Sequence, residues 1–294
     1  MEVAFITASF LPSLYEDDRL AATGLFERGI TVTPVIWDTT TPERLSQFDA
    51  VVMRSPWDWV RRREDFRAFL SSLDRVEAPV FNCPGVMQRF ADKLYLLDLA
   101  KRGIRVPPTF ALEQSELDRV PGLMEEQGWH EAVLKPAFTA GAYDTYRFAR
   151  HRATEAVAEA VAVPLEARER WLVQPYLPDI MQGELSFMFF DGVFSHAVKK
   201  VPPPGEWRVH ELHGGGIEPI DVSDEYVSQA SAMLAAAAPA TLYGRVDCVV
   251  VDGSLTLMEL ELVEPELFFR FEPQAAARFA EALVRRLSPA VGRS

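Results

Sequence analysis

Short apolar runs alternate with amphipathic segments through the first part of the chain. The runs have the length and β-branched content of buried strands, and the amphipathic segments repeat their apolar positions at helical spacing. This alternation predicts a small parallel α/β layer, with ligands expected beyond the carboxyl ends of its strands. The predicted strands are Val3–Thr7, Thr31–Trp37, Ala50–Arg54 and Pro79–Phe81, and the predicted helices are Asp17–Arg28 and Arg61–Leu73.

The remaining pattern changes to a mixture of hairpins and helices. Asp-Gly pairs at 191–192 and 252–253 each separate two apolar runs, which predicts two antiparallel hairpins. The fold class expected for the whole chain is therefore α/β, with an α+β second part. The further predicted strands are Ala132–Pro136, Trp171–Leu177, Phe187–Phe190, Phe194–Lys199, Val246–Val251 and Leu255–Val263, and the helices are Ala91–Arg102, Ser115–Gln127, Tyr226–Leu242 and Gln274–Leu287.

The last predicted hairpin carries acidic residues where an apolar pattern is otherwise maintained. Asp247 lies early on its first strand, and Glu259 and Glu261 lie two apart on the second, so their side chains share one face. Three carboxylates on one face repel one another unless a cation lies among them, and hard oxygen ligands suit Mg²⁺. The alternative is a solvated acidic stripe. Glu264 and Glu266, which follow directly, keep that alternative open.

Composition and charge limit the classes of function. The chain has 294 residues, 48% of them hydrophobic, and a net charge of −13, which argues against a broad nucleic-acid surface or an anionic-membrane partner. Two cysteines are too few for a disulfide framework or a structural zinc site. No signal-peptide pattern and no long uncharged apolar run occur, so a cytoplasmic protein is expected. Nothing marks an interface, which leaves a homo-oligomer open.

Candidate binding chemistry appears at three places in the chain. Lys135 ends a short strand and precedes a small-residue loop around Gly141, an arrangement that suits phosphate binding. Lys93 lies near the start of a predicted helix, where a solvated lysine is the usual interpretation. Arg54 and Trp57 lie beyond a strand end, where the alternative is a surface arginine and a packed tryptophan. Neither GxGxxG nor GxxxxGK[ST] occurs, which disfavours a dinucleotide oxidoreductase and a P-loop NTPase.

The order of these pieces resembles the ATP-grasp superfamily, and more closely its glutathione-synthetase-like branch. The resemblance extends from about Phe48 to about Leu267 and rests on motifs in sequence order. The motifs are Asp92-Lys93, Leu134-Lys135-Pro136, Gln174-Pro175-Tyr176-Leu177, Gly183-Glu184-Leu185-Ser186, Arg208, and Asp247 followed by Glu259-Leu260-Glu261. It implies a Rossmann-like N-terminal domain (residues 1–88), a central subdomain (89–175) and a C-terminal subdomain (176–294) that hold ATP between two antiparallel sheets.

The resemblance also implies roles for individual residues. Lys93 and Lys135 correspond to lysines that hold the ATP phosphates, with Gly141 in the loop that covers them. Arg208 corresponds to the arginine at the transferring phosphoryl group, with Lys199 or Lys200 as a helper. The segment that reads adenine and the acid near the ribose correspond to Gln174, Tyr176, Leu177 and Glu184.

Asp247, Glu259 and Glu261 match the Mg²⁺ ligands of the branch, which implies Mg²⁺, with two ions expected and Mn²⁺ as an alternative. The sequence departs from the branch at one ligand, because the usual pattern is E-x-N and the last position here is Glu261. The extra carboxylate adds negative charge to the site, which puts its exact geometry in question.

The implied activity is ATP-dependent ligation of a carboxylate to an amine through an acyl phosphate, on a small amino-acid-like substrate. A subset of the branch shares the RSPWD and MELELVEPELFF wording and includes the ligase that closes the cycloserine ring from O-ureidoserine. Arg54 and Trp57 are the expected substrate-binding residues. His196 and His213 are possible bases, although structural roles are the more usual interpretation. The alternatives are a dipeptide or glutathione-type synthetase and a non-catalytic nucleotide-binding protein.

Overall fold

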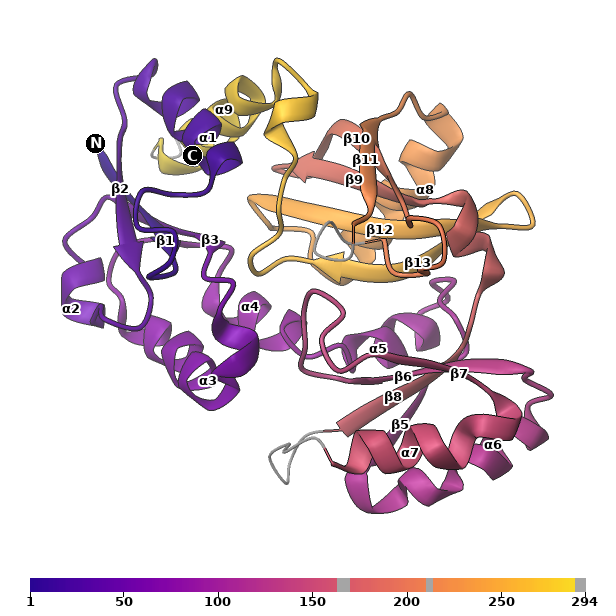
Figure 1. Cartoon of the computed structure of the whole chain (residues 1–294). Helices are drawn as coiled ribbons and strands as arrows, with labels where there is room; N and C mark the ends of the chain where they lie inside the picture. Colours follow the sequence, from indigo (N-terminus) through magenta and orange to yellow (C-terminus); the bar gives the residue numbers. More distant parts are fainter. Residues whose placement is uncertain (163–169, 210–213, 289–294) are drawn as a thin grey trace.

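The protein is described here by a computed structural model that covers residues 1–162, 170–209 and 214–288. Three β-sheets organise the chain, one parallel and two antiparallel. Figure 1 shows the parallel sheet at one side and the two antiparallel sheets facing each other across an intervening space. The predicted α/β fold with two antiparallel sheets is confirmed. The domain boundaries at residues 88 and 175 stay a prediction.

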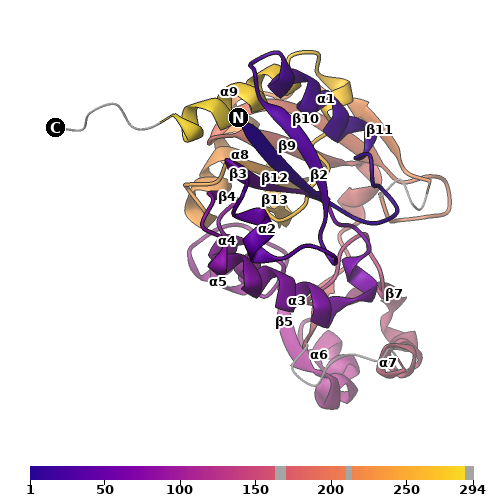
Figure 2. The same cartoon turned by 90° about the vertical axis from the view of Figure 1, so that its left-hand side faces the viewer.

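The parallel sheet has the strand order β2-β1-β3-β4, as the strand–helix alternation predicts. The C-terminal helix α9 (Ala275–Leu287) returns to this sheet and packs beside α1, which Figure 2 shows from the N-terminal side. A Cβ atom added at Gly24 of α1 would lie 2.8 Å from the Ala276 carbonyl oxygen, so glycine permits this close approach. The elements are β1 (Glu2–Thr7), α1 (Glu16–Phe26), β2 (Thr31–Ile36), α2 (Pro42–Leu45), β3 (Ala50–Ser55), α3 (Arg63–Ser72) and β4 (Val80–Phe81).

The first antiparallel sheet has the order β5-β8-β6-β7, with two helices over one face. Its predicted central strands are present. Strand β7 and helix α7 are additional; β7 has only four residues, too few for a clear alternation of apolar and polar positions, and α7 is a short alanine-rich helix. The elements are β5 (Phe110–Glu113), α6 (Val120–Glu126), β6 (Glu131–Pro136), β7 (Tyr146–Ala149), α7 (Ala153–Val161) and β8 (Arg170–Pro175).

The second antiparallel sheet has the order β11-β10-β9-β12-β13 and contains both predicted hairpins. Strand β9 lies at its centre, and all seven of its residues are buried. Helix α8 covers the face away from the first antiparallel sheet. The elements are β9 (Glu184–Phe190), β10 (Val193–Val201), β11 (Gly216–Pro219), α8 (Asp224–Ala237), β12 (Tyr243–Val251) and β13 (Ser254–Glu261).

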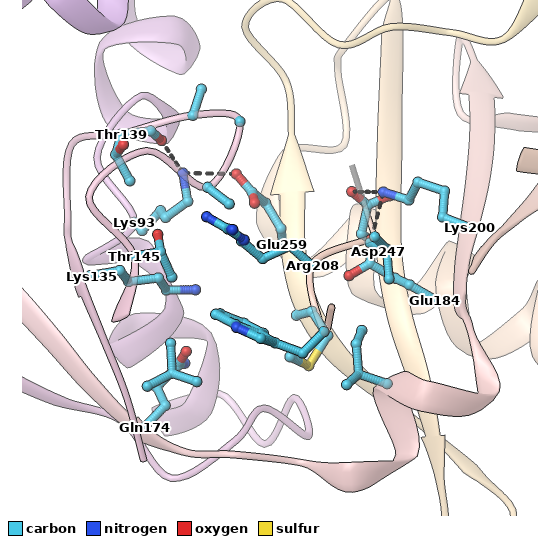
Figure 3. Close-up of a pocket in the computed structure, with 18 of the residues that line it drawn as sticks. Lys93, Lys135, Thr139, Thr145, Gln174, Glu184, Lys200, Arg208, Asp247 and Glu259 are labelled. Carbon is cyan, nitrogen blue, oxygen red and sulfur yellow. Dashed lines mark hydrogen bonds and ion pairs between the residues drawn. The ribbon is translucent and has the colours of Figure 1, made fainter. Parts of the chain in front are cut away.

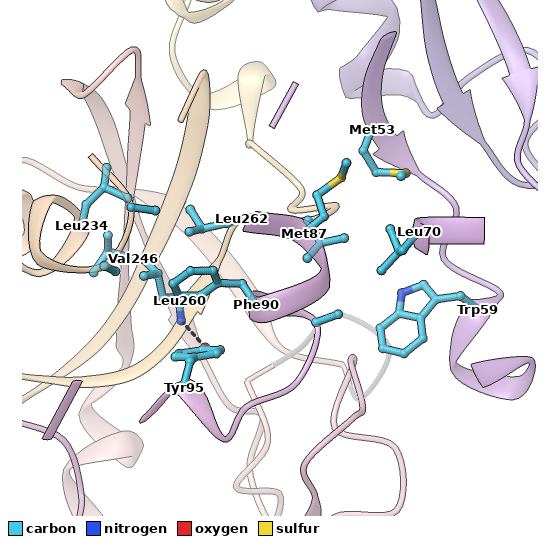
Figure 4. Close-up of a cluster of buried hydrophobic side chains, with 14 of the residues drawn as sticks. Met53, Trp59, Leu70, Met87, Phe90, Tyr95, Leu234, Val246, Leu260 and Leu262 are labelled. Atoms are coloured by element: carbon cyan, nitrogen blue, oxygen red, sulfur yellow. Dashed lines mark hydrogen bonds between the residues drawn. The ribbon is translucent and has the colours of Figure 1, made fainter. Parts of the chain in front are cut away.

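Two short helices, α4 (Pro84–Phe90) and α5 (Tyr95–Lys101), join the three sheets. Tyr95 is buried, and its hydroxyl accepts a hydrogen bond from the Leu260 backbone N–H at 2.8 Å, so α5 is fixed to β13 (Figure 4). The helix predicted from Ala91 is wrong at its start. Lys93 lies instead in the turn before α5, where its backbone N–H donates to the Ala137 carbonyl at 2.8 Å.

No helix in the described part of the chain is both long enough and apolar enough to cross a membrane.

Candidate active site

A cavity of about 160 Å³ lies between the two antiparallel sheets, and Figure 3 shows charged side chains entering it from both sides. The structure brings most of the predicted ATP-site and metal residues together on its wall, although they are spread over the sequence. These residues are Lys93, Lys135, Gly141, Gln174, Tyr176, Leu177, Glu184, Arg208, Asp247, Glu259 and Glu261.

Strand alternation explains why the acids meet at this cavity. Asp247 on β12 is paired in register with Glu259 on β13 and with Ser186 on β9, so these side chains project from one face of the sheet. Residues two apart on a strand keep that face, which adds Glu184 of β9 and Glu261 of β13. The intervening residues point to the opposite, apolar face under α8.

The two predicted phosphate-binding lysines approach from the other side of the cavity. The Lys93 ammonium lies 2.8 Å from a Glu259 carboxylate oxygen and donates a short hydrogen bond to the Thr139 carbonyl. Burial by itself lowers the pKa of Lys93, but Glu259 more than reverses this, so the ammonium is retained. Burial lowers the pKa of Lys135 to about 8, with Lys93 acting in the same direction and Glu259 opposing it.

Each acid of the hairpin is bound to a basic side chain. Asp247 lies 3.1 Å from the Lys200 ammonium and 2.9 Å from the Arg245 guanidinium, and accepts a 2.6 Å hydrogen bond from Ser186. Despite burial, these cations hold the pKa of Asp247 well below its usual range. Arg245 also forms a short ion pair with Glu261. The described residues contain no group of three acidic, His or Cys side chains already arranged around one metal position.

The donor chemistry nevertheless fits Mg²⁺. The acids offer only carboxylate oxygens, the ligands that this ion prefers, and they face lysines suited to phosphates across the same cavity. Burial, with Glu259 and Asp247 nearby, raises the pKa of Glu261 to about 8 although Arg245 opposes it. A carboxylate group that is crowded in this way is stabilised by an added cation. Asp247, Glu259 and Glu261 are therefore suited to hold the ion.

The predicted helper role of Lys199 is wrong, because its side chain points away from the cavity. Neighbouring residues of a strand point to opposite faces, so only one of the two lysines on β10 can face the cavity. Lys200 faces it and lies 2.5 Å from Glu184, which is its register partner on β9. The Lys199 side chain lies against Gly183 instead. Arg245 also lines this cavity and is missed by the sequence interpretation, which leaves Lys200 undecided. Strand alternation is the signal that could have found both, because Arg245 lies two residues from Asp247 and Lys200 pairs with Glu184.

The residues predicted to read adenine line the same cavity. Gln174 is buried and donates to the Thr109 hydroxyl at 2.9 Å. The Tyr176 ring lies below the Arg147 guanidinium at 3.6 Å and edge-on to Trp207 at 6.2 Å. Arg208 is bound by Glu206 at 2.6 Å in the same region. A planar base would find apolar and aromatic contacts here.

The loop around Gly141 is joined to the N-terminal α/β layer. Gly141 has φ +60°, and Asp144 of the same loop forms a 2.8 Å ion pair with Arg63 of α3. Phe138, which begins the loop, packs edge-on against Trp59 at 4.7 Å. Ala140 and Gly141 of this loop line both the first cavity and a second cavity on the N-terminal side.

The second cavity has a volume of about 460 Å³, and Trp57 lines it. The substrate-binding role of Trp57 stays a prediction. Arg54 is not part of the cavity, which corrects its predicted role. Arg54 is 1% exposed, its Nε donates to Asp18 at 2.9 Å, and its Nη2 donates to the Pro265 carbonyl at 3.0 Å. A guanidinium enclosed in this way is a structural group and is closed to substrate.

Glu264 and Glu266 line the same cavity, so neither forms part of a solvated stripe. His196 is buried, and its two ring nitrogens are hydrogen-bonded to Ser195 Oγ (2.9 Å) and to the Leu267 carbonyl (3.1 Å). Burial lowers the pKa of His196 to about 4. His196 lies outside both cavities and has a structural position. His213 lies outside the described residues.

Comparison with known proteins identifies the family to which this chain belongs. Residues 3–82 match the model described as the N-terminal domain of D-cycloserine synthetase DcsG, and residues 92–260 match the ATP-grasp domain of prokaryotic glutathione synthetase. The chain is 35% identical over 276 residues to the cycloserine biosynthesis protein DcsG of Streptomyces lavendulae, covering 89% of this chain and 90% of that protein.

Solved structures agree with this assignment. The crystal structure of D-cycloserine synthetase DcsG superposes with a TM-score of 0.87 at 30% identity, covering 98% of this chain and all of that one. The fold is also that of the ATP-grasp ligase PsnB solved with a precursor variant, Mg and ADP, with a TM-score of 0.68 at 16% identity over 97% of this chain and 98% of that chain. The family implies ATP and Mg²⁺. The chain therefore belongs to the ATP-grasp ligases, in the glutathione-synthetase branch, among the proteins similar to DcsG.

Proposed function

We propose that this protein forms cycloserine by closing a ring in the small amino-acid-like substrate O-ureidoserine, with consumption of ATP. The observation that carries the proposal is the pair of adjoining cavities, one lined by lysines and hairpin acids, the other by aromatic residues and further acids. The similarity to DcsG over nearly the whole chain supports the same substrate class.

The reaction divides into three steps. A carboxylate oxygen of the substrate attacks the γ-phosphorus of ATP, so that ADP leaves and an acyl phosphate forms. The oxygen-bound ureido nitrogen then attacks the acyl carbon, phosphate leaves, and the ring closes. Because cycloserine lacks the carbamoyl group of O-ureidoserine, hydrolysis must remove this group as ammonia and carbon dioxide.

The residues of the first cavity support the phosphoryl step through charge and position. Lys93 and Lys135 are proposed to hold phosphate oxygens, with Arg208 or Lys200 at the transferring group. Asp247, Glu259 and Glu261 would hold Mg²⁺, two ions in our proposal with Mn²⁺ as an alternative, which balances the charge that develops on the phosphates. The Gly141 loop would shield the acyl phosphate from water.

The most direct test of the proposed activity is ADP release with Mg-ATP against amino acids supplied singly and in pairs, with O-ureidoserine among them. We expect turnover with O-ureidoserine alone and a cycloserine product. A strict requirement for two amino acids would instead favour a dipeptide or glutathione-type synthetase. ATP binding without turnover of any substrate would favour a non-catalytic nucleotide-binding protein.

ATP affinity should depend on pH through Lys135. Its pKa of about 8 in the free protein means that the ammonium is charged below pH 8 and largely neutral at pH 9, where it attracts phosphate less. The Kd of a non-hydrolysable ATP analogue with Mg²⁺ should therefore rise by about tenfold from pH 7 to pH 9. In the Lys135→Arg variant the charge persists at both pH values, so this dependence should be lost. An equally steep rise in that variant would contradict the assignment.

A further inference from the structure

The second cavity combines aromatic walls with carboxylates that the phosphoryl step leaves unused. Tyr15 and Trp57 pack edge-on at a centroid distance of 4.9 Å, and Trp59 completes the wall. Glu264 and Glu266 line the same cavity as these rings. Aromatic faces and carboxylates together favour a positively charged nitrogen, because the ring quadrupole and the anion attract the same charge.

Glu264 is held rigidly by two indole groups. The Trp59 Nε1 donates to a Glu264 carboxylate oxygen at 2.6 Å, and the Trp57 Nε1 donates to the Glu264 backbone carbonyl at 3.0 Å. Trp59 is only 2% exposed and is stacked on Phe66 with ring centroids 5.0 Å apart. The position of the carboxylate is therefore fixed before any ligand arrives.

The two acids of this cavity differ in how their charge is balanced. Glu266 forms a short ion pair with Arg270 and accepts a 3.2 Å hydrogen bond from the Tyr15 hydroxyl. Among the described residues, the carboxylate of Glu264 has a hydrogen-bond donor in Trp59 and no ion-pair partner of its own. The nearby Lys93 is bound to Glu259. Glu264 is thus a fixed anion with room for a cation.

Glu264 also lies close to the place where a carboxylate must be activated. Lys93, Glu259 and Glu264 line one narrow crevice, and Gly141, Arg245 and Glu261 are shared by the two large cavities. In an α-amino acid the ammonium and the carboxylate are attached to the same carbon. A group that binds the ammonium must therefore lie beside the phosphoryl-transfer position, and Glu264 shares its crevice with Lys93 and Glu259, the residues proposed to hold the phosphates and the metal.

We infer that Glu264 is the residue that binds the α-ammonium group of the substrate in the second cavity. This inference rests on the proposed function and names a residue for substrate recognition. Trp59 holds the Glu264 carboxylate and Trp57 holds the Glu264 backbone. Tyr15 and Trp57 contact the rest of the substrate. The reactive carboxylate then extends past Gly141 toward the phosphates.

The kinetic test compares wild-type protein with Glu264→Gln and with Glu116→Gln, a charge-matched control outside both cavities. With O-ureidoserine, Glu264→Gln should raise KM by about 10- to 100-fold, as for loss of a charge-assisted hydrogen bond, while kcat changes much less. Glu116→Gln should keep KM near the wild-type value, because Glu116 lies at the surface in an ion pair with Arg119. Equal KM values for wild type and Glu264→Gln would overturn the inference, whereas cycloserine formation by wild type would still support the proposed function.

A binding test separates recognition of the ammonium from the proposed reaction. Serine and glycerate differ at the α-carbon by an ammonium in place of a hydroxyl, and binding of each with Mg-ADP present can be followed by tryptophan fluorescence, since Trp57 and Trp59 line the cavity. Wild type and Glu116→Gln should prefer serine, and Glu264→Gln should lose the preference. The inference is overturned if wild type shows no preference for serine or if Glu264→Gln keeps it. Absence of cycloserine in the kinetic test would instead refute the proposed function and leave this comparison valid.

Discussion

Substitution of Glu259 by Gln should nearly abolish turnover while the fold is kept. Glu259 lies 2.8 Å from the Lys93 ammonium, opposite Asp247 in register and on the wall of the nucleotide cavity. Glutamine preserves shape and removes the charge needed for Mg²⁺ and for the position of Lys93. Because such groups stabilise charge that develops on the phosphates, kcat should fall by about 10²- to 10³-fold or more.

The measurement is ADP release at saturating Mg-ATP, accompanied by a thermal unfolding curve. The Glu259 side chain is 29% exposed, so the melting temperature should shift by only a few degrees, about 2–4 °C for each kcal/mol in a chain of this size. Glu116→Gln serves as a control, because Glu116 is an exposed partner of Arg119. Near-normal ATP consumption by Glu259→Gln would show that Glu259 is not a metal ligand.

Substitution of Arg54 by Met should destabilise the protein strongly, because Arg54 is structural. Arg54 and Asp18 are each 1% exposed, and the guanidinium lies 5.3 Å from the Tyr243 ring centroid as well as on the Pro265 carbonyl. Removal of the cation leaves the Asp18 charge buried without its partner. The expected loss is about 3–5 kcal/mol in the free energy of unfolding, measured by denaturant titration.

Two further variants make this test specific. Asp18→Asn combined with Arg54→Met should recover part of the lost stability, because no buried charge is then left alone. Arg119→Met breaks an exposed ion pair with Glu116 and should cost at most about 1 kcal/mol. If Arg54→Met unfolds like wild type but raises the substrate KM, the original substrate-binding role of Arg54 would be restored.

Much of the fold follows from local patterns in the sequence. Period-two alternation and the two Asp-Gly turns predict the hairpins that carry Glu184, Asp247 and Glu259, and strand–helix alternation predicts the parallel sheet. The motif order then predicts that Lys93 and Lys135 face these acids. Short edge strands such as β11 are missed because their residues are largely exposed and carry little apolar signal.

The remainder depends on tertiary contacts that no local pattern encodes. Arg54 finds Asp18 on a helix that precedes it by 36 residues, which turns a candidate ligand into a buried structural group. In the sequence Glu264 is one of a run of acidic residues, and only its contacts with Trp57 and Trp59 distinguish it from a surface acid. The sequence alone does not distinguish Lys199 from Lys200. Only the register of β10 on β9 decides which lysine faces Glu184.

In the proposed reaction the substrate carboxylate is activated as an acyl phosphate in the first cavity. Transfer of an isotope label from the carboxylate to phosphate tests this step most directly. O-ureidoserine labelled with ¹⁸O in its carboxylate is converted with Mg-ATP, and the released phosphate is analysed by mass spectrometry. Attack of the carboxylate on the γ-phosphorus moves one labelled oxygen into phosphate, so singly labelled phosphate should accumulate in step with ADP and cycloserine. Unlabelled phosphate, or label found in AMP, would contradict this account.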